Sequence, residues 1–540
     1  MAAPTQTSTI ETDSRASASN RAGFVDSVDA ASGQVVGKIF ATLTENVPQL
    51  MARAREAQKS WAARSMRERC GYLRKMRDAI YEFRDEVTNA ISLETGKPHV
   101  EAVFAELILA LDSADFLARQ APEWLRPERV GHHNIAVKAK SGSIYFQPFG
   151  VLAIISPWNY PFSIPMAQIL PALVAGNAVL LKPSELTPRV GELIGKIIAA
   201  AGVPVGLVQV LQGEGAVGAA LIEANPDKVF FTGSVATGKR IAESCARRLI
   251  PTSLELGGKD AMIVLADADI EIASSAAVWG GFMNCGQTCI SVQRIYVEEP
   301  IAPQFIATCV EKTRKLRLGP PSDRDAEIGP MIRVAQLEKV ETQLRDAVAR
   351  GAQIACGGNR RVDLGPTFLE PAVVTNVDHS MPLMREETFG PVIAICAVKS
   401  ADEAVALAND SDFALSASVW TGNAAKGREI ALRIRAGSVM INDVASYYGI
   451  SEAPHGGSRS SGWGRSHSRF GLLEMVQVKY VDVDLLPRTP KSWWFGYNEG
   501  LAAAADRFVD FLFAPRWTRR MGALASTRGA LGTVFRGHRI

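Results

Sequence analysis

The strongest constraint on the fold is a regular alternation of apolar runs and amphipathic segments between residues 142 and 250. The apolar runs are VLAIIS, NAVLLKPS, GLVQVLQG and KVFFTG, and a stretch with helical spacing follows each of them. Strands that are continuously apolar and alternate with helices indicate a parallel sheet covered on both faces. Such sheets bind ligands at the carboxyl ends of their strands. We therefore expect a doubly wound α/β domain with a ligand site at that edge.

Two further regions have other patterns of apolar residues. Residues 45 to 125 predict helices: NVPQLMARAREAQKSWAA is one, and RERCGYLRKMRDAIYEFRDEVTNAISLETG is another that ends at Gly96. A second alternating block from about residue 260 to 445 predicts a second α/β domain, with the strands AMIVLA, RIYVEE, PAVVTN, VIAICAV, ASVWTG and SVMIND. A chain of 540 residues is too long for one core, which agrees with two or three domains.

The composition excludes several classes of protein. A net charge of +3 argues against a nucleic-acid binder with concentrated basic faces. Seven scattered cysteines are typical of reduced thiols in a cytoplasmic protein rather than of a disulfide framework. No apolar stretch is long enough to span a bilayer. Residues 1–22, rich in Ser, Thr and Ala, lack the apolar core of a signal peptide, and we expect a disordered arm there.

The segment FTGSVATGKR has the outline of a phosphate-binding turn. Gly233, Gly238 and Lys239 have P-loop spacing, but Arg240 stands where that motif needs Ser or Thr to hold magnesium. A nucleotide diphosphate at a helix N-terminus is an alternative, because free backbone N–H groups and the helix dipole attract phosphate. Taken alone, the segment is best explained as a plain turn between a strand and a helix.

Two further segments hold candidate catalytic side chains. Glu255, in SLELGGKD, ends an apolar run and is a general base if burial raises its pKa; an isolated Glu at a strand end more often faces solvent. GFMNCGQTCIS contains Cys285 and Cys289 without a second cysteine pair or a His cluster nearby, so we expect no metal site. A buried inert thiol is the common case. The polar, flexible residues just before Cys289 instead suit a thiol in a cleft.

In combination these motifs resemble the aldehyde dehydrogenase superfamily over roughly residues 25 to 485. The matching blocks, in the family's usual order, are SPWNYP, LLKPSELTP, FTGSVATG, LELGGK, NCGQTC and REETFGPV. The resemblance implies an α/β fold with a Rossmann-type NAD-binding domain, an α/β catalytic domain and a small β oligomerisation arm. The implied segments are the NAD-binding domain over 23–257 with the β-arm at about 135–150, the catalytic domain over 258–445, and a return to the NAD-binding domain and β-arm over 446–487. Outside the resemblance, the composition predicts a disordered arm over 1–22 and an amphipathic basic tail over 488–540.

The resemblance also implies a reaction, the NAD(P)-dependent oxidation of an aldehyde to a carboxylic acid. Cys289 is the nucleophile, Asn159 donates a hydrogen bond to the oxyanion, and Glu255 activates the water that hydrolyses the thioester. The implied cofactor-binding residues are Trp158, Lys182, Glu185, Gly233, Ser234, Glu387 and Phe389. The Glu185 carboxylate suits ribose hydroxyls and repels a 2′-phosphate, so we expect NAD, with NADP as the alternative. The family's β-arm joins subunits, which implies a homodimer or homotetramer.

Three positions depart from the family pattern or bear on it. Ser466 stands where the family often has Glu, which leaves the proton relay without a second acid. His455 replaces a Phe, and either lines the substrate route or is a surface or satisfied histidine. Cys285 could form a protective disulfide with Cys289, although a pocket-lining thiol is the commoner case.

Two rival functions are a relative that passes the acyl group to coenzyme A and a family member that is not an enzyme. Glu255 argues against the first of these, and the intact Cys289 and Asn159 argue against the second.

The substrate is expected to be an apolar aldehyde, of medium or long chain or aromatic. An apolar, aromatic set is predicted to line the tunnel: Tyr160, Phe162, Ile164, Phe282, Met283, Tyr447 and Tyr448. The layout also resembles some bacterial succinate-semialdehyde dehydrogenases, and that substrate is the alternative. A common member of that group has an Arg on the helix after PWN to hold the far carboxylate, and Ala167 occupies the matching place here.

The tail over 488–540 lies beyond the family's core. Leu501, Ala505, Phe508 and Leu512 fall at helical spacing, and Pro515 should end that helix. The residues beyond it include no acid, and they comprise Arg516, Trp517, Arg519, Arg520, Arg528, Phe535, Arg536 and Arg539. An apolar helix followed by a basic aromatic segment fits a peripheral anchor on a membrane surface. The alternative is a helix that packs on the enzyme or on a neighbouring subunit.

Overall fold

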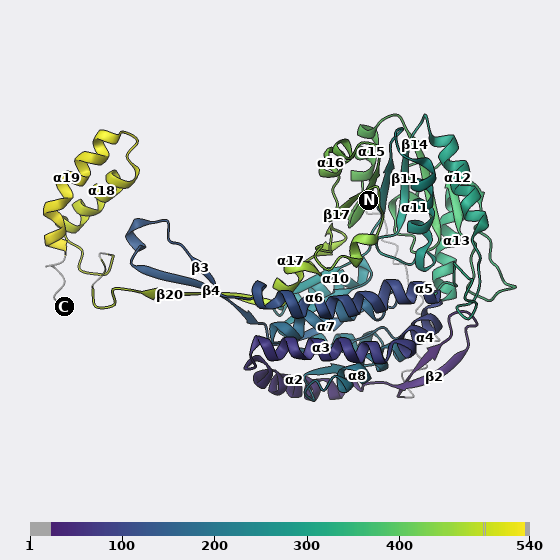
Figure 1. Ribbon diagram of the computed structural model, residues 1–540, viewed down its shortest axis with the longest axis horizontal. Coiled ribbons are helices and arrows are strands. Elements are labelled where there is room, and N and C mark those ends of the chain that lie inside the picture. The colour runs from purple at the N-terminus through teal and green to yellow at the C-terminus, as the bar shows by residue number, and fades with distance from the viewer. Residues whose placement is uncertain (1–22, 490, 492, 535–540) are drawn as a thin grey trace, which may run out of the picture. The chain divides into compact units, whose positions relative to one another are not determined.

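The structure is a computed structural model that describes residues 23–489, 491 and 493–534 (Figure 1). The arm expected over residues 1–22 lies outside the described residues, as do Phe535, Arg536 and Arg539 of the tail. The chain divides into two compact units. The first comprises the residues up to Arg126 together with Phe146–Gln477, and the second comprises Pro127–Tyr145 together with the residues from Val478 onward.

The first sheet of the larger unit has the strand order β19-β9-β8-β5-β6-β7. Its parallel strands are β5 (Val151–Ile155), β6 (Ala178–Lys182), β7 (Val208–Val210), β8 (Lys228–Thr232) and β9 (Thr252–Glu255). The connecting helices are α7 (Ser163–Ala175), α8 (Pro188–Ala200), α9 (Gly215–Glu223) and α10 (Val235–Ala246). Every residue of β5, β6 and β8 is buried, so the continuous apolar runs did mark a parallel sheet covered on both faces.

The helices that precede this sheet correct one expectation. They are α2 (Val47–Ala62), α3 (Met66–Glu82), α4 (Arg84–Thr95), α5 (His99–Ala102) and α6 (Ile108–Trp124). The single helix expected to end at Gly96 is therefore two, because Phe83 has a non-helical backbone with φ −87° and ψ 6°. Apolar spacing continues across this break and could not reveal it. Gly96 ends α4 as predicted, in the left-handed conformation with φ 77°. Between α5 and α6 lies η3 (Val103–Leu107), a single π-helical turn.

The second sheet of this unit has the order β12-β13-β14-β11-β10-β16-β17. Its parallel strands are β10 (Asp260–Val264), β11 (Val292–Glu298), β13 (Ala372–Thr375), β14 (Val392–Val398), β16 (Ser416–Trp420) and β17 (Ser438–Ile441), as predicted. The antiparallel edge strand β12 (Gln353–Cys356) was not predicted. Helices on this sheet are α11 (Ile270–Phe282), α12 (Ala302–Lys315), α13 (Val334–Ala349), α14 (Pro382–Arg385), α15 (Ala401–Asn409) and α16 (Ala424–Arg433). Each sheet lies in its own hydrophobic core.

Short elements complete the larger unit. The pairs β1 (Phe24–Val28) with β2 (Val35–Phe40), and β15 (Phe413–Ala414) with β18 (Ser458–Arg459), are antiparallel. β19 (Gly462–Trp463) adds antiparallel to β9, with Gly462 opposite Glu255. Gly462 has φ 97°, and a Cβ there would lie 2.1 Å from the Leu254 oxygen, so this close pairing needs glycine. α17 (Ser468–Leu473) follows it.

The smaller unit contains an antiparallel sheet and two helices. The sheet has the order β20-β4-β3, from β3 (Glu128–Val130), β4 (Lys140–Pro148) and β20 (Val476–Asp484). α18 (Glu499–Phe513) ends just before Pro515, as expected, and Asn498 caps its first turn. The basic segment beyond Pro515 also forms a helix, α19 (Trp517–Val534), which packs against α18 and was not predicted. Among the described residues, no helix is both long and apolar enough to cross a bilayer.

Candidate active site

A cleft of about 710 Å³ opens at the carboxyl ends of β5, β6, β8 and β9 in the larger unit. The cleft brings together all ten residues that were predicted to be catalytic or cofactor-binding. Its lining includes Trp158, Asn159, Lys182, Glu185, Gly233, Ser234, Glu255, Cys289, Glu387 and Phe389. The first sheet supplies the side chains that follow its strands, and the loop after α11 brings Cys289 to the opposite wall. The position agrees with the rule that open α/β sheets bind ligands at this edge.

The loop that carries the cysteines has an unusual backbone. Asn284 and Cys285 have φ 51° and 54°, and Gly286 follows with φ 69°. A Cβ at Gly286 would lie 2.1 Å from the Gly390 oxygen, and one at Gly258 would lie 2.3 Å from the Cys289 oxygen. Glycine is therefore required on both sides of the nucleophile loop. This backbone turns the side chain of Cys289 into the cleft and leaves Cys285 buried, at 2 % exposure.

The environment of Cys289 favours the protonated thiol. Burial raises the pKa of the Cys289 thiol, and the nearby carboxyl groups of Asp260, Glu387 and Glu255 raise this pKa further. An attack by the sulfur on a carbonyl carbon therefore requires the thiol to give up its proton in the course of the reaction.

Glu255 ends β9 and faces the cleft with only 7 % of its surface exposed. Burial raises the pKa of Glu255 to about 7, and the hydroxyl groups of Ser466 and Thr232 beside it oppose this rise. A carboxyl group with this pKa exchanges a proton with water near neutral pH. Ser466, which stands where the family often has Glu, thus places a hydroxyl beside the candidate base.

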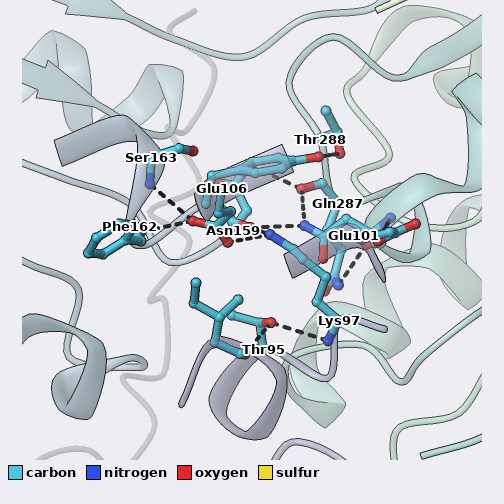
Figure 2. Close-up of polar contacts among 12 residues, drawn as sticks. Thr95, Lys97, Glu101, Glu106, Asn159, Phe162, Ser163, Gln287 and Thr288 are labelled. Atoms are coloured by element: carbon cyan, nitrogen blue, oxygen red, sulfur yellow. Dashed lines mark hydrogen bonds and ion pairs between the residues drawn. The ribbon is translucent and has the colours of Figure 1, made fainter. Parts of the chain in front are cut away.

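Asn159 lines the cleft and is bonded to the loop that carries Cys289. Its side-chain Nδ2 donates to the Gln287 carbonyl oxygen at 3.0 Å, two residues before Cys289. Its own backbone oxygen accepts hydrogen bonds from Lys97 Nζ at 2.9 Å and from Asn284 Nδ2 at 3.0 Å (Figure 2). An amide nitrogen carries two N–H groups, so one of them is left for a ligand in the cleft.

The far part of the cleft has features that fit a dinucleotide. Lys182 Nζ lies 2.8 Å from the Glu185 carboxylate. Burial acts to raise the pKa of Glu185, but Lys182 more than offsets it, and the pKa lies below its ordinary value. Ser234 caps α10 by accepting a hydrogen bond from Thr237 N, and a Cβ at Gly233 would lie 2.6 Å from the Phe231 ring. A helix N-terminus preceded by a glycine is where a pyrophosphate binds.

Two aromatic rings, a carboxylate and two cations also line the cleft that holds Cys289. The rings of Trp158 and Phe389 are 5.5 Å apart and nearly perpendicular. The Glu387 carboxylate accepts a hydrogen bond from Gly258 N at 3.0 Å. Arg333 and Lys339, on or beside α13, also line the cleft. These two cations could not be predicted from the sequence, because no motif marks them and basic residues on or beside a helix are usually solvated.

The surroundings of His455 show whether this residue is buried or lies at the surface. His455 is 2 % exposed, and its Nδ1 lies 2.9 Å from the Tyr447 hydroxyl. The ring of Tyr448 contacts both His455 and His467 edge-on. Burial lowers the pKa of His455 to about 3 and that of His467 to about 4, so both are neutral. His455 is therefore a buried, partnered histidine and not a surface one.

The expected tunnel lining is corrected in part. Phe162 and Phe282 are 0 % and 1 % exposed and are packed into the two cores, which leaves them no surface for a substrate. Ile164 lines the main cleft. Tyr160 donates to or accepts from Thr288 Oγ1 at 2.8 Å, beside Cys289. Ala167 and His467 line a second, small cavity whose described lining contains no Lys or Arg.

Proteins with similar sequences belong to one family. A model of the aldehyde dehydrogenase family matches residues 16–481. A 4,4'-diapolycopene aldehyde oxidase of Methylomonas sp is 38% identical over 91% of both chains. A putative succinate-semialdehyde dehydrogenase [NADP(+)] of Mycolicibacterium smegmatis is 39% identical over 85% of this chain and 90% of its own length.

Solved structures of the family have the same fold. An NAD-dependent aldehyde dehydrogenase from Sinorhizobium meliloti matches with a TM-score of 0.83 and 37% identity, over 87% of this chain and 93% of its own. A betaine aldehyde dehydrogenase from Staphylococcus aureus in complex with NAD+ also has a TM-score of 0.83, with 31% identity over 88% and 94% of the two chains. The chain belongs to the aldehyde dehydrogenase family, as an NAD(P)-dependent enzyme that acts on small-molecule aldehydes.

Proposed function

We propose that the enzyme oxidises an apolar aldehyde, of medium or long chain or aromatic, to its carboxylic acid through a covalent intermediate on Cys289. The observation that supports this most is that Cys289, Asn159 and Glu255 line one cleft together with the cofactor-binding set. The three side chains are a nucleophile, a hydrogen-bond donor and a base, which are the groups that acyl transfer from an aldehyde requires.

The steps follow from these groups. The Cys289 sulfur attacks the carbonyl carbon and loses its proton, and a thiohemiacetal forms. The negative charge on the carbonyl oxygen is stabilised by Asn159 Nδ2 and by the backbone N–H of Cys289; one such donor contributes roughly 3 kcal/mol in the transition state. NAD held by the cofactor-binding set would supply the hydride acceptor, and loss of the hydride from the thiohemiacetal carbon would leave a thioester on Cys289. Glu255 then takes a proton from water, the water oxygen attacks the thioester carbon, and the acid leaves while the sulfur regains a proton.

The cofactor-binding roles are part of the same proposal. Lys182 and Glu185 contact the adenosine ribose, Gly233 and Ser234 hold the pyrophosphate, Trp158 lines the cleft, and Glu387 and Phe389 contact the nicotinamide side. All of these residues line the cleft.

NAD is expected to be preferred over NADP. The Glu185 carboxylate, kept ionised by Lys182, would meet the 2′-phosphate of NADP with like charge. Glu185→Ser should raise kcat/KM for NADP by about tenfold, equivalent to about 1.4 kcal/mol. Steady-state kinetics with both cofactors would measure it, with Glu192→Ser on the exposed side of α8 as the matched control. A wild-type enzyme that prefers NADP would contradict the assignment.

The substrate proposal is supported by the uncharged surroundings of Ala167. The described lining of the small cavity beside Ala167 contains no cation to hold a second carboxylate, and His467 in it is neutral. The two relatives are named for different substrates, a 4,4'-diapolycopene aldehyde and succinate semialdehyde, so their names do not choose between the candidates.

We expect kcat/KM for decanal or benzaldehyde to exceed that for succinate semialdehyde by more than about tenfold, because an unpaired carboxylate is costly to bury. Ala167→Arg should shift the ratio toward succinate semialdehyde. Ala167→Leu, which adds bulk without charge, is the control. Wild-type kinetics that favour succinate semialdehyde would make it the substrate instead.

We also propose a cytoplasmic homodimer or homotetramer joined through the β-arm, with its tail on an anionic membrane surface. None of the fifteen residues of α18 is buried, although the structure describes them all. Exposed aromatic side chains accompany basic ones along this segment: Trp493, Trp494, Phe495, Phe513 and Trp517. Aromatic and arginine side chains together suit the interface of an anionic bilayer.

Co-sedimentation with vesicles tests the tail. The full-length protein should pellet with vesicles that contain anionic lipid, and less with neutral phosphatidylcholine or at high salt. A version that ends near residue 487 should stay in the supernatant. A full-length variant with Arg516, Arg519 and Arg520 changed to Gln keeps the tail but removes three of its positive charges. It therefore distinguishes the effect of charge on vesicle binding from the effect of removing the tail. Equal recovery of the full-length and shortened proteins in the supernatant would leave the tail as a packing element.

A further inference from the structure

A fully buried ion pair lies directly behind Asn159 (Figure 2). Lys97 and Glu106 are 1 % and 0 % exposed, and Lys97 Nζ lies 2.5 Å from Glu106 Oε1. Lys97 follows the left-handed Gly96 at the end of α4, and Glu106 belongs to the π-helical turn η3. π-helical turns are rare and are frequent at functional sites. Buried ion pairs can often be replaced by apolar side chains without loss of stability, so stability alone does not account for this pair.

The ammonium group of Lys97 has three donors, and each has a partner. Besides Glu106 Oε1, these are the Asn159 backbone oxygen at 2.9 Å and the face of the Tyr160 ring, whose centroid is 3.9 Å from Nζ. These three contacts fix the position of the Lys97 ammonium group, and its hydrogen bond in turn holds the carbonyl group of Asn159 in place.

Glu106 holds the other side of the same segment. Its Oε2 accepts hydrogen bonds from Phe162 N at 2.8 Å and from Ser163 N at 3.1 Å. These are free N–H groups at the start of α7, which begins at Ser163. The chain from Asn159 to Ser163 is thus held at both ends by one carboxylate, through Lys97 at Asn159 and directly at α7.

The network extends to the loop of the nucleophile. Asn284 Nδ2 donates both to the Asn159 oxygen at 3.0 Å and to the Gln287 oxygen at 3.1 Å, and Asn284 N donates to Glu101. The Gln287 oxygen also accepts from Asn159 Nδ2. The amide of Asn159 and the backbone two residues before Cys289 are therefore tied into one set of bonds.

We propose that Lys97 and Glu106 are positioning residues that hold Asn159 at the distance from Cys289 at which its amide can stabilise the oxyanion. This inference rests on the oxyanion role proposed above for Asn159. The pair contacts neither the cleft nor Cys289, so it acts through Asn159. A network that is buried and fully partnered is rigid, which is what a hydrogen-bond donor for a transition state needs.

The double variant Lys97→Met, Glu106→Gln tests this. It removes both charges together, keeps the side-chain volumes, and leaves an amide oxygen to accept from the N–H groups of α7. We expect kcat to fall by about 10- to 100-fold, the effect of a displacement on the order of 1 Å. KM for NAD should not change. The rate of Cys289 alkylation by iodoacetamide should also not change, because that displacement forms no oxyanion. A slowed alkylation would overturn the proposal, since it would place the effect on the nucleophile.

A double-mutant cycle with Asn159→Ala shows whether the pair acts through Asn159. If it does, the combined variant should be no slower than Asn159→Ala alone. Multiplied effects would overturn the inference, because Lys97 and Glu106 would then act elsewhere. If Asn159→Ala itself leaves kcat unchanged, the proposed oxyanion role of Asn159 fails, and this outcome is distinct from failure of the positioning role.

Two more variants keep the test decisive if the double variant does not fold. Asn284→Gly removes the second donor to the Asn159 oxygen and suits the φ of 51° at that position, and it should show the same lack of additivity with Asn159→Ala. Glu94→Gln is the matched control, because the buried Glu94 caps α8 through Arg189 N and Val190 N as Glu106 caps α7. A loss of kcat in Glu94→Gln as large as in the double variant would mean that any lost buried cap has this effect, and the inference would fail.

Discussion

Replacing Cys289 with alanine is expected to lower the rate of aldehyde oxidation by at least about 10³-fold, because Cys289 is the only thiol among the described residues that line the cleft. NAD should still bind with its affinity unchanged, since Lys182, Glu185 and the N-terminus of α10 lie in another part of the cleft. NADH absorbance gives the turnover rate, and calorimetric titration gives the binding constant.

Cys285→Ala is the matched control for this prediction. Cys285 lies four residues before Cys289, on the same loop, but is 2 % exposed and does not line the cleft. Burial and a nearby carboxyl group raise the pKa of its thiol as they do for Cys289, so the two cysteines differ in their access to the cleft. Most activity should remain in Cys285→Ala. The assignment would be reversed if Cys285→Ala stopped turnover and Cys289→Ala did not.

The parallel strands were predictable from the sequence because they are buried on both faces. β5, β6 and β8 are buried at every residue, and such strands leave unbroken apolar runs. The antiparallel edge strands β12 and β19 left no such mark. β12 is exposed or half-buried along its length, and β19 is two residues whose place depends on the left-handed Gly462 and its contact with the backbone of Leu254. The break at Phe83 was equally hidden, since one non-helical residue does not disturb the apolar spacing around it.

The candidate site was predictable where motifs carry it and not where packing does. The ten residues that line the cleft were found through a resemblance based on short ordered motifs. Lys97 and Glu106 were missed because charged side chains are usually solvated, and neither belongs to a motif. One signal was present: Glu106 stands alone in the apolar run AVFAELILA, where an isolated acid is either exposed or buried with a partner. The partners could not be identified, because Lys97 lies in the loop before α5 and the N–H groups of Phe162 and Ser163 are distant in the sequence.

Replacing Glu255 with glutamine is expected to slow steady-state turnover by about 10²- to 10⁴-fold while leaving the first turnover fast. Glutamine keeps the shape of the buried side chain but cannot accept a proton from water. Hydride transfer precedes hydrolysis, so each active site should release one equivalent of NADH rapidly and then stall as the thioester. Rapid-mixing absorbance would show this burst, and mass spectrometry of the quenched enzyme would show the acyl group on Cys289.

The pH profile provides an independent test of the same role. Burial raises the pKa of Glu255 to about 7, and only the deprotonated carboxylate can take a proton from water. The rate of hydrolysis should therefore fall as the pH drops through about 7, and it should level off above it. This limb should disappear in Glu255→Gln, whose residual hydrolysis has no such group. Glu94→Gln is the control, because burial also raises the pKa of Glu94 to about 7, yet Glu94 does not line the cleft, so that variant should keep the limb. Loss of the NADH burst in Glu255→Gln would instead show that Glu255 acts on the Cys289 thiol before hydride transfer.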